Sequence, residues 1–84
     1  MLALPLIVIT GRHIRAARAL LGISQEELAR KAKIALRTLS RMEEFDGAVG
    51  ARTATLNHVV MALEKAGIEF LDGGKPGVRL IGKG

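Results

Sequence analysis

Cysteine is absent from this chain of 84 residues, and histidine occurs only twice, as His13 and His58. Without cysteine the chain can form neither a disulfide framework nor a thiolate metal site. The two histidines lie too far apart in the sequence to suggest a local metal pair, so we expect no metal and no cofactor, and we expect both side chains to be exposed or interfacial. Because disulfides are rare in reducing compartments, the expected location is the cytoplasm.

Residue groupings that support catalysis are missing as well. The sequence has no paired carboxylates in a setting that suggests a cleft, no Ser-His-Asp or Cys-His set, and no glycine-rich phosphate loop. The stretch DGGKPG at residues 72–77 lacks both the spacing and the strand-to-helix context of a P-loop. We therefore expect that the protein is not an enzyme.

The apolar run at residues 1–9, MLALPLIVI, is too short to span a bilayer and lacks the basic region and cleavage site of a signal peptide. We expect no membrane partner. The β-branched residues in this run favour a packed strand over residues 6–9, with Pro5 at the strand edge. One alternative is that this run forms a leader without fixed structure. The other is that it is read from an upstream start codon that the cell does not use.

The length of the chain indicates a single domain over residues 1–84, and the sequence shows no internal repeat, low-complexity tract or linker. A domain of this size buries only about 60% of the surface of its unfolded chain, so its stability is marginal unless something adds to it. We expect that dimerisation does so.

Positive charge is concentrated in the first half of the chain. Eight of the 13 lysines and arginines precede residue 42, against two acidic residues, Glu26 and Glu27. Such a basic balance draws a protein toward phosphate backbones, anionic membranes or acidic partner surfaces. Charge alone does not choose among these partners.

A first helix is predicted over residues 11–21. Thr10 is placed to cap its N-terminus, and Gly22 to end it in the left-handed conformation. Apolar residues recur at helical spacing on one face, and basic residues lie on the other. The apolar face carries Ile14, Ala17, Leu20 and Leu21, and the outer face carries Arg12, Arg15 and, at its border, Arg18.

Residues 24–44 predict a helix-turn-helix. Ser24 and Glu27 have the spacing of a capping box, which marks the start of a helix. Small residues on the inner face of this helix allow a second helix to cross closely. Ile34 is expected to pack its side chain inward at the turn between the two helices. The next helix is predicted over residues 35–44. The inner faces of the two helices carry Leu28, Ala29, Ala32, Leu39 and Met42, and the outer face of the second carries Arg37, Thr38 and Arg41.

The remainder of the chain predicts a loop, a helix and a hairpin. Glycines break the periodicity over residues 45–52, after which Thr53 is expected to cap a fourth helix that ends at Gly67. Apolar residues within this helix recur at helical spacing, at Leu56, Val59, Val60 and Leu63. Two short apolar runs, 68–71 and 78–81, predict a β-hairpin within residues 68–82. Because an isolated hairpin is barely stable, we expect it to pair with the strand at 6–9 or with a second copy of the chain.

The stretch QEELARKAKIALRTLSRME at residues 25–43, with Arg18 upstream, resembles the Cro and phage-repressor family of helix-turn-helix proteins, also called the Xre family. The resemblance covers roughly residues 12–66. It implies a mostly α, phage-repressor-like DNA-binding domain of four helices, here with a C-terminal β-hairpin and a candidate N-terminal strand. The stretch IEFLDGGKPGVRL near the C-terminus resembles a small bacterial subgroup of these regulators.

The resemblance also implies roles for individual residues. Gln25 is expected to contact a phosphate and brace the recognition helix, and Arg18 to form a structural salt bridge with Glu43. The residues that the resemblance places against DNA are Ala35, Leu36, Arg37, Thr38 and Arg41 in the major groove, and Arg52 and Thr53 at the backbone.

Three positions depart from the family pattern. Lys33 stands where glycine is common, so a non-glycine residue is expected to hold a left-handed conformation at a cost of about 1 kcal/mol. Leu36 stands where a polar base-reading residue is common. Phe45 replaces the glycine that usually ends the recognition helix, which moves the turn to Asp46 and Gly47.

We therefore interpret the chain as a bacterial or phage transcriptional regulator, a repressor or an activator, that binds double-stranded DNA as a homodimer. The helix at 35–44 enters successive major grooves about 34 Å apart. Arg37 and Arg41 lie on one face and can each contact guanine, whereas Leu36 either touches a thymine methyl group or packs at a dimer seam. The alternative is an antitoxin-like or accessory module that binds a partner protein through its hairpin and apolar N-terminus.

Overall fold

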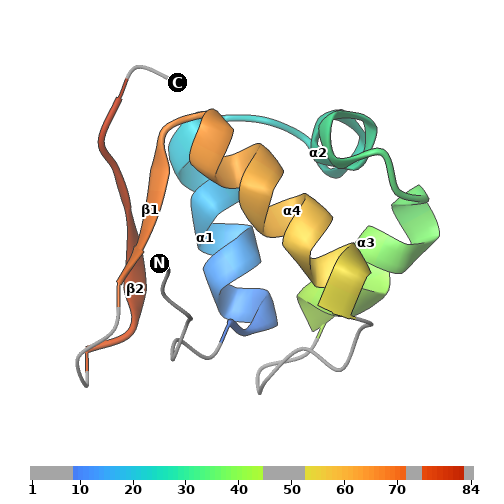
Figure 1. Ribbon diagram of the computed structural model, residues 1–84, viewed down its shortest axis with the longest axis horizontal. Helices are drawn as coiled ribbons and strands as arrows, with labels where there is room; N and C mark the ends of the chain where they lie inside the picture. Colours follow the sequence, from blue (N-terminus) through green and yellow to red (C-terminus); the bar gives the residue numbers. More distant parts are fainter. Residues whose placement is uncertain (1–8, 45–52, 72–74, 83–84) are drawn as a thin grey trace.

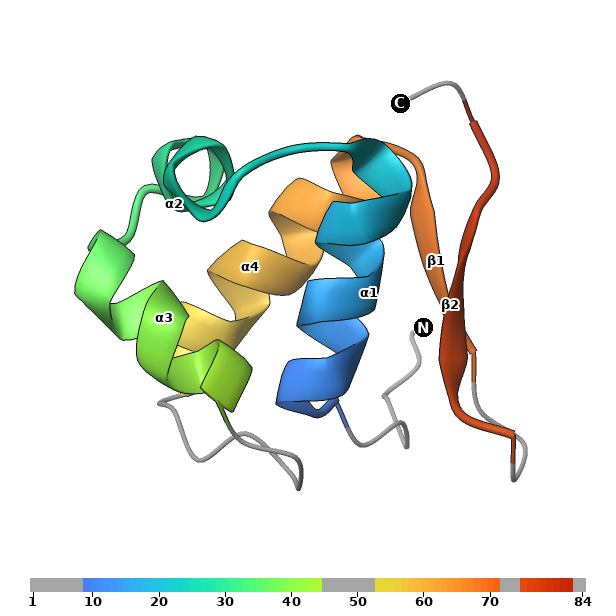
Figure 2. The same cartoon turned by 180° about the vertical axis from the view of Figure 1, so that it is seen from behind.

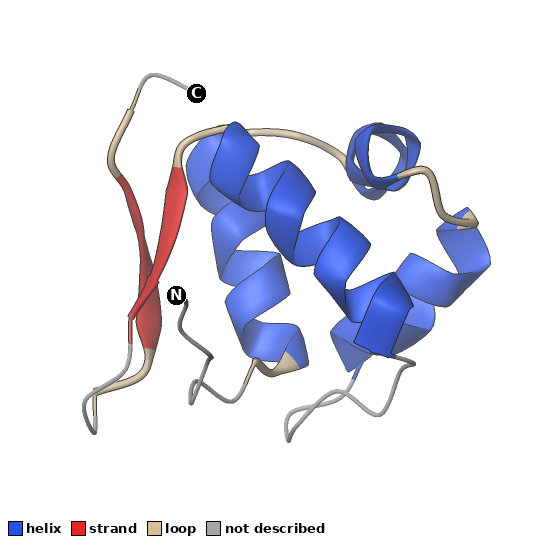
Figure 3. Ribbon diagram, in the orientation of Figure 1, coloured by secondary structure: helices blue, strands red, loops and turns tan. Residues whose placement is uncertain are grey.

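The computed structural model describes residues 9–44, 53–71 and 75–82 of the chain. Within these ranges it contains four helices followed by a two-stranded antiparallel sheet, as the sequence predicted (Figures 1 and 3). The predicted loop at 45–52 and all but the last residue of the predicted strand at 6–9 lie outside the described residues. In chain order the elements are α1 (Gly11–Leu21), α2 (Gln25–Ala32), α3 (Leu36–Glu44), α4 (Thr53–Lys65), β1 (Ile68–Leu71) and β2 (Gly77–Leu80).

The helix ends form where the sequence predicted them because each has its own local hydrogen bonds. Thr10 caps α1, and Gly22 ends it at φ 70° in the left-handed conformation. Ser24 caps α2, where the Ser24 hydroxyl accepts from the Glu27 N–H at 3.0 Å and the Glu27 carboxylate accepts from the Ser24 N–H at 3.0 Å. Gly67, just beyond α4, also has a positive φ. These groups satisfy backbone donors and acceptors that have no partner inside the helix.

The turn between α2 and α3 contains no glycine, and Lys33 adopts the left-handed conformation there with a φ of 59°. It is the only non-glycine residue of the described chain with a positive φ. Ile34 follows it and packs partly against the core, as predicted. The turn therefore keeps the geometry that a helix-turn-helix needs, at the expense of strain at one lysine.

The core lies where the four helices and the hairpin meet. Its largest fully buried side chains come from five different elements, and they are Ile14, Leu28, Leu39, Val59, Leu63 and Ile68. Displacing any one of the helices would therefore expose apolar surface to water. The small residues Ala29 and Ala32 are buried on the inner face of α2, where that helix packs against both α3 and α4. This confirms the inner faces that helical spacing predicted.

The hairpin packs on α1 of the same chain, and it lies at the opposite end of the molecule from α3 in both views (Figures 1 and 2). Ile68 pairs with Leu80 and Phe70 with Val78, so these side chains share the face that turns toward the helices. Glu69 pairs with Arg79 on the outer face and accepts hydrogen bonds from its guanidinium. The sequence did not predict this packing on α1, and the predicted pairing with the strand at 6–9 falls on residues that, Ile9 apart, lie outside the described part of the chain.

Five finer predictions are corrected. Leu20 was placed on the apolar face of α1 but is 47% exposed near the end of that helix. Thr53 was expected to cap α4 but is its first residue, and the residue before it lies outside the described residues. The helix predicted from Ala35 begins at Leu36, and the second strand is shifted one residue toward the N-terminus.

The fifth correction concerns His13, which was expected to be exposed or interfacial and is buried. Its Nδ1 accepts a hydrogen bond from the Thr10 N–H at 3.0 Å, and its ring lies 6.2 Å from that of Phe70. His13 holds the third position of α1, where a glutamate or glutamine usually closes the capping box. The place of His13, three residues after Thr10, could therefore have indicated from the sequence that it closes a capping box.

Replacing Lys33 by glycine is expected to stabilise the fold. Glycine removes the left-handed strain of about 1–2 kcal/mol but makes the unfolded chain more flexible, which leaves a net gain of about 0.5–1 kcal/mol. Urea denaturation followed by circular dichroism measures this gain. Lys31→Gly, in the last turn of the same helix, is the matched control and should destabilise by about 1 kcal/mol. Equal losses in both variants would show that Lys33 is not strained.

Candidate nucleic-acid interface

The outer face of α3 presents two arginines to solvent. Arg37 and Arg41 lie four residues apart, so they share one face of the helix, and both are exposed. Thr38 is half-buried between them. Leu36, at the start of the helix, is 40% exposed. The inner face of the same helix is buried through Leu39 and Met42, and this packing directs the arginines outward.

Ala35 occupies the N-cap position of α3. It is exposed, and its carbonyl oxygen accepts a hydrogen bond from the Leu39 N–H at 3.1 Å. The structure thus brings together, on and just before α3, all five residues that the sequence assigned to the major groove. Of the two residues assigned to the DNA backbone, Arg52 lies outside the described residues and Thr53 begins α4.

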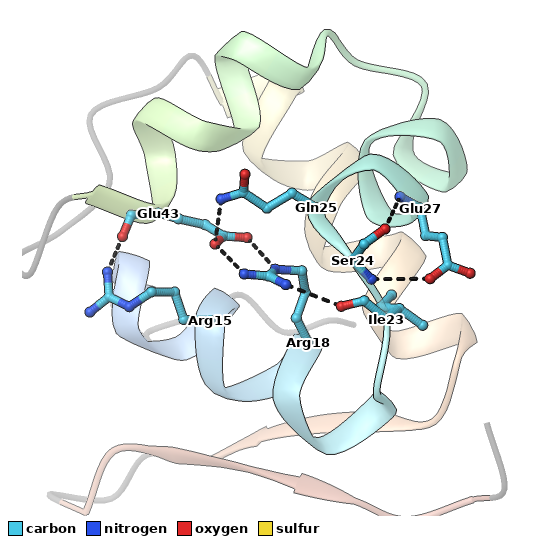
Figure 4. A network of polar contacts seen from close by, with 7 residues as sticks. All are labelled: Arg15, Arg18, Ile23, Ser24, Gln25, Glu27 and Glu43. Carbon is cyan, nitrogen blue, oxygen red and sulfur yellow. Dashed lines mark hydrogen bonds and ion pairs between the residues drawn. The ribbon is translucent and has the colours of Figure 1, made fainter.

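A buried carboxylate, that of Glu43, holds α3 against the other two helices (Figure 4). Glu43 is only 3% exposed. Arg18 of α1 donates to it from two nitrogens, Nε to Oε2 at 2.8 Å and Nη2 to Oε1 at 2.9 Å. Gln25 at the start of α2 donates from Nε2 to Oε1 at 3.0 Å. The salt bridge between Arg18 and Glu43 that the resemblance implied is present, and it has the bidentate geometry of strong carboxylate pairs.

Two further contacts complete this arrangement. Arg18 Nη1 donates to the carbonyl oxygen of Ile23 at 3.1 Å, in the connection between α1 and α2. Arg15 Nη1 donates to the main-chain oxygen of Glu43 at the end of α3. Figure 4 shows these side chains converging from α1 and α2 on one residue of α3. We refer to Arg15, Arg18, Gln25 and Glu43 as the Glu43 network.

The electrostatics of the Glu43 network favour the charged pair. Hydrogen bonding to Glu43, together with its negative charge, raises the pKa of the Arg18 guanidinium, although partial burial acts in the opposite direction. Arg18 therefore stays protonated at every pH at which the protein folds. An arginine in this position can fix the geometry of a carboxylate through hydrogen bonds, but it does not exchange its proton as a general acid or base.

Sequence reasoning missed one contact of this site. Arg15 was placed on the outer face of α1, yet it reaches the end of α3, 28 residues away in the sequence. Helical periodicity locates a side chain on a face but does not reveal a neighbour on another helix. Gln25 was expected to brace the recognition helix and to contact a phosphate, and its hydrogen bond to Glu43 supplies the brace. The amide has a second N–H, so this contact leaves a donor for another acceptor.

The described residues contain no group of three or more histidine, aspartate or glutamate side chains arranged to hold a metal ion. Among the helices of the described chain, none has the length and the apolar character that crossing a bilayer requires. His58 is exposed on α4, in agreement with the sequence analysis.

Comparison with known families agrees with this geometry. A family model described as helix-turn-helix matches residues 14–46, which include nearly all of α1 together with α2 and α3. A search of curated proteins found no match. Residues 14–46 are thus similar to the helix-turn-helix of the Cro/Xre type that the sequence analysis indicated. The matched segment contains every member of the Glu43 network and the whole exposed face of α3.

Removing the charge of Glu43 tests the network. Glu43→Gln leaves Arg18 without a charged partner, and we expect the free energy of unfolding to fall by roughly 3 kcal/mol, the lower end for a broken buried pair because Arg18 is partly in contact with water. Glu44→Gln changes the neighbouring exposed residue and should alter stability by less than about 0.5 kcal/mol. Urea denaturation of both variants gives the comparison, and similar losses would contradict the role assigned to Glu43.

Proposed function

We propose that the chain is a sequence-specific transcriptional regulator that binds double-stranded DNA with α3 in the major groove. The observation that carries this proposal is the exposed pair Arg37 and Arg41 on a helix held rigidly by the Glu43 network. A helix fits the major groove, and an arginine there can make two hydrogen bonds to guanine. Rigid presentation supports selectivity because both guanidinium groups then approach the base edges in one register.

The remaining residues of this surface have complementary roles in the proposal. Thr38 donates to a phosphate or places its methyl group against thymine, and Leu36 contacts a thymine methyl group or a second copy of the chain. Gln25, at the N-terminus of α2, contacts a phosphate with its second amide hydrogen, where the positive end of the helix dipole favours an anion. Arg52 and Thr53 contact the backbone beside the groove. Phosphate contacts supply affinity, and α3 supplies selectivity.

We further propose that the chain binds DNA as a homodimer, with the two copies of α3 one or more helical turns of about 34 Å apart. Three large apolar side chains, Leu20, Leu80 and Ile81, remain exposed at the end of the molecule that carries the hairpin. Leu20 and Leu80 line one hollow there, so apolar surface is contiguous across α1 and β2. Covering this surface with a second copy adds the burial that a small domain lacks.

The DNA proposal is tested by selecting duplexes from a random pool at near-physiological salt, in parallel with the Arg37→Ala/Arg41→Ala variant. We expect the native chain to enrich an inverted repeat and the variant to lose or relax that preference, because each bidentate guanine contact discriminates by about 1–3 kcal/mol. The matched control, Arg30→Ala/Lys75→Ala, also removes two exposed positive charges. It should bind more weakly and keep the same preference. No enrichment by the native chain would favour the antitoxin-like, partner-binding alternative.

The dimer proposal is tested by analytical ultracentrifugation over roughly 1–300 µM protein. We expect a dimer, weakened at least tenfold in Leu20→Ser/Ile81→Ser because that change makes the apolar surface polar. Met61→Ser changes a side chain of similar exposure at a different surface and should leave the association unchanged. A native chain that sediments only as a monomer at the highest concentration would contradict the proposal.

A further inference from the structure

A groove of about 390 Å³ lies between the C-terminal end of α2 and one face of α4. From α4 come Met61, Ala62 and Lys65, whose three- and four-residue spacing places them on one helix face. From α2 and the turn after it come Lys31, Ala32 and Lys33. We call this surface the α2–α4 groove. It shares no residue with the Glu43 network or with the outer face of α3.

The α2–α4 groove combines an apolar floor with a basic rim. Met61 is 64% exposed, the highest value among the large apolar side chains of the described residues. Methionine adapts its shape to different apolar partners, which suits a binding surface. The three lysines are exposed, and none forms an ion pair within the part of the chain that the structure describes. One acidic residue, Glu64, also lines the groove, so the rim is positive overall.

Lys33 supplies an independent observation. Its backbone is left-handed, a conformation that glycine adopts without strain. A strained non-glycine residue is retained most readily where its side chain serves a purpose, and strain of this kind concentrates at binding sites. The Lys33 side chain lines the α2–α4 groove. A positive charge at this point of the groove accounts for a lysine at a position where glycine would give a more stable fold.

The shape of the groove indicates the kind of partner. Sites for small molecules enclose most of the surface of their ligand, whereas the side chains that form this rim are exposed to solvent. An amphipathic protein segment needs only an open groove with anchor points along it. We propose that the α2–α4 groove binds an acidic amphipathic segment of a partner protein, with an apolar side chain on Met61 and carboxylates paired with Lys31, Lys33 and Lys65.

The position of the groove favours a protein partner over DNA. In Figure 1 α4 passes in front of α3, and in Figure 2 it lies behind α3, so the two helices occupy different sides of the molecule. Neither Arg37 nor Arg41 is among the residues that line the groove. The proposal goes beyond the DNA-binding function, since a partner at this groove and a duplex at α3 can be bound together.

The proposal is tested by selecting binders from a displayed library of random 16-residue peptides, using the full chain as the target. We expect acidic peptides with apolar residues at helical spacing. Their affinity, measured by fluorescence anisotropy, should fall at least tenfold in Lys31→Ser/Lys33→Gly and at least fivefold in Met61→Ser. The Lys33→Gly change is expected to stabilise the fold. Weaker peptide binding by the double variant Lys31→Ser/Lys33→Gly would therefore not be explained by unfolding.

Matched controls separate the groove from the rest of the basic surface. Arg30→Ser removes an exposed charge of α2 outside the groove. It should bind the selected peptides within twofold of the native chain. The Arg37→Ala/Arg41→Ala variant should also retain peptide binding, which distinguishes failure of this proposal from failure of the DNA proposal.

Three results would overturn the proposal. The first is that no acidic amphipathic peptide is enriched. The second is that the enriched peptides respond to the Arg37→Ala/Arg41→Ala variant and not to the lysine variant, which would place them on α3. The third is that Lys31→Ser/Lys33→Gly weakens duplex binding as much as loss of the two arginines does, which would make the groove part of the DNA backbone contact.

Discussion

The carboxylate of Glu43 is the constraint on which the arrangement of the first three helices depends. It is buried where α1, α2 and α3 meet, and a buried charge without partners is strongly unfavourable. Arg18 and Gln25 supply those partners from two different helices. Any rotation or shift of α3 would separate Glu43 from at least one of them. The network therefore fixes α3 relative to the rest of the molecule, and the outer face of α3 acquires a defined orientation.

The hairpin contributes to the stability of this small chain. It packs its apolar face on α1, with Phe70 beside His13, and so covers a side of that helix that α2 and α3 leave open. Because the hairpin and α3 lie at opposite ends of the molecule, this added core does not obstruct the exposed arginines (Figure 2). The α2–α4 groove shares no lining residue with the outer face of α3, whereas Lys31 lines both this groove and the hollow beside the hairpin. A chain of 84 residues thus presents the outer face of α3 apart from two further surfaces that meet at Lys31.

Signals that act within one helical turn were readable from the sequence. Thr10, Ser24 and Gly22 end their helices through hydrogen bonds to residues at most four positions away, so the type of residue and its spacing were sufficient. Lys33 was also predicted correctly, because it stands where the family that the sequence resembles commonly has glycine. Leu20 was misplaced because its burial depends on whether another element happens to cover the end of α1. His13 was misjudged because histidine rarely closes a capping box.

The sequence by itself determined the helix limits, the inner and outer faces, the hairpin and the type of helix-turn-helix, because each of these follows from local spacing or from a linear motif. The resemblance implied the Arg18–Glu43 pair and the bracing role of Gln25, and only the tertiary structure decided which other groups meet across the fold. Arg15 reaches Glu43, and the hairpin packs on α1. Lys31, Lys33 and Lys65 line one groove although they come from two helices and a turn. Contacts of this kind depend on how the helices cross, and crossing is set by the packing of the whole core.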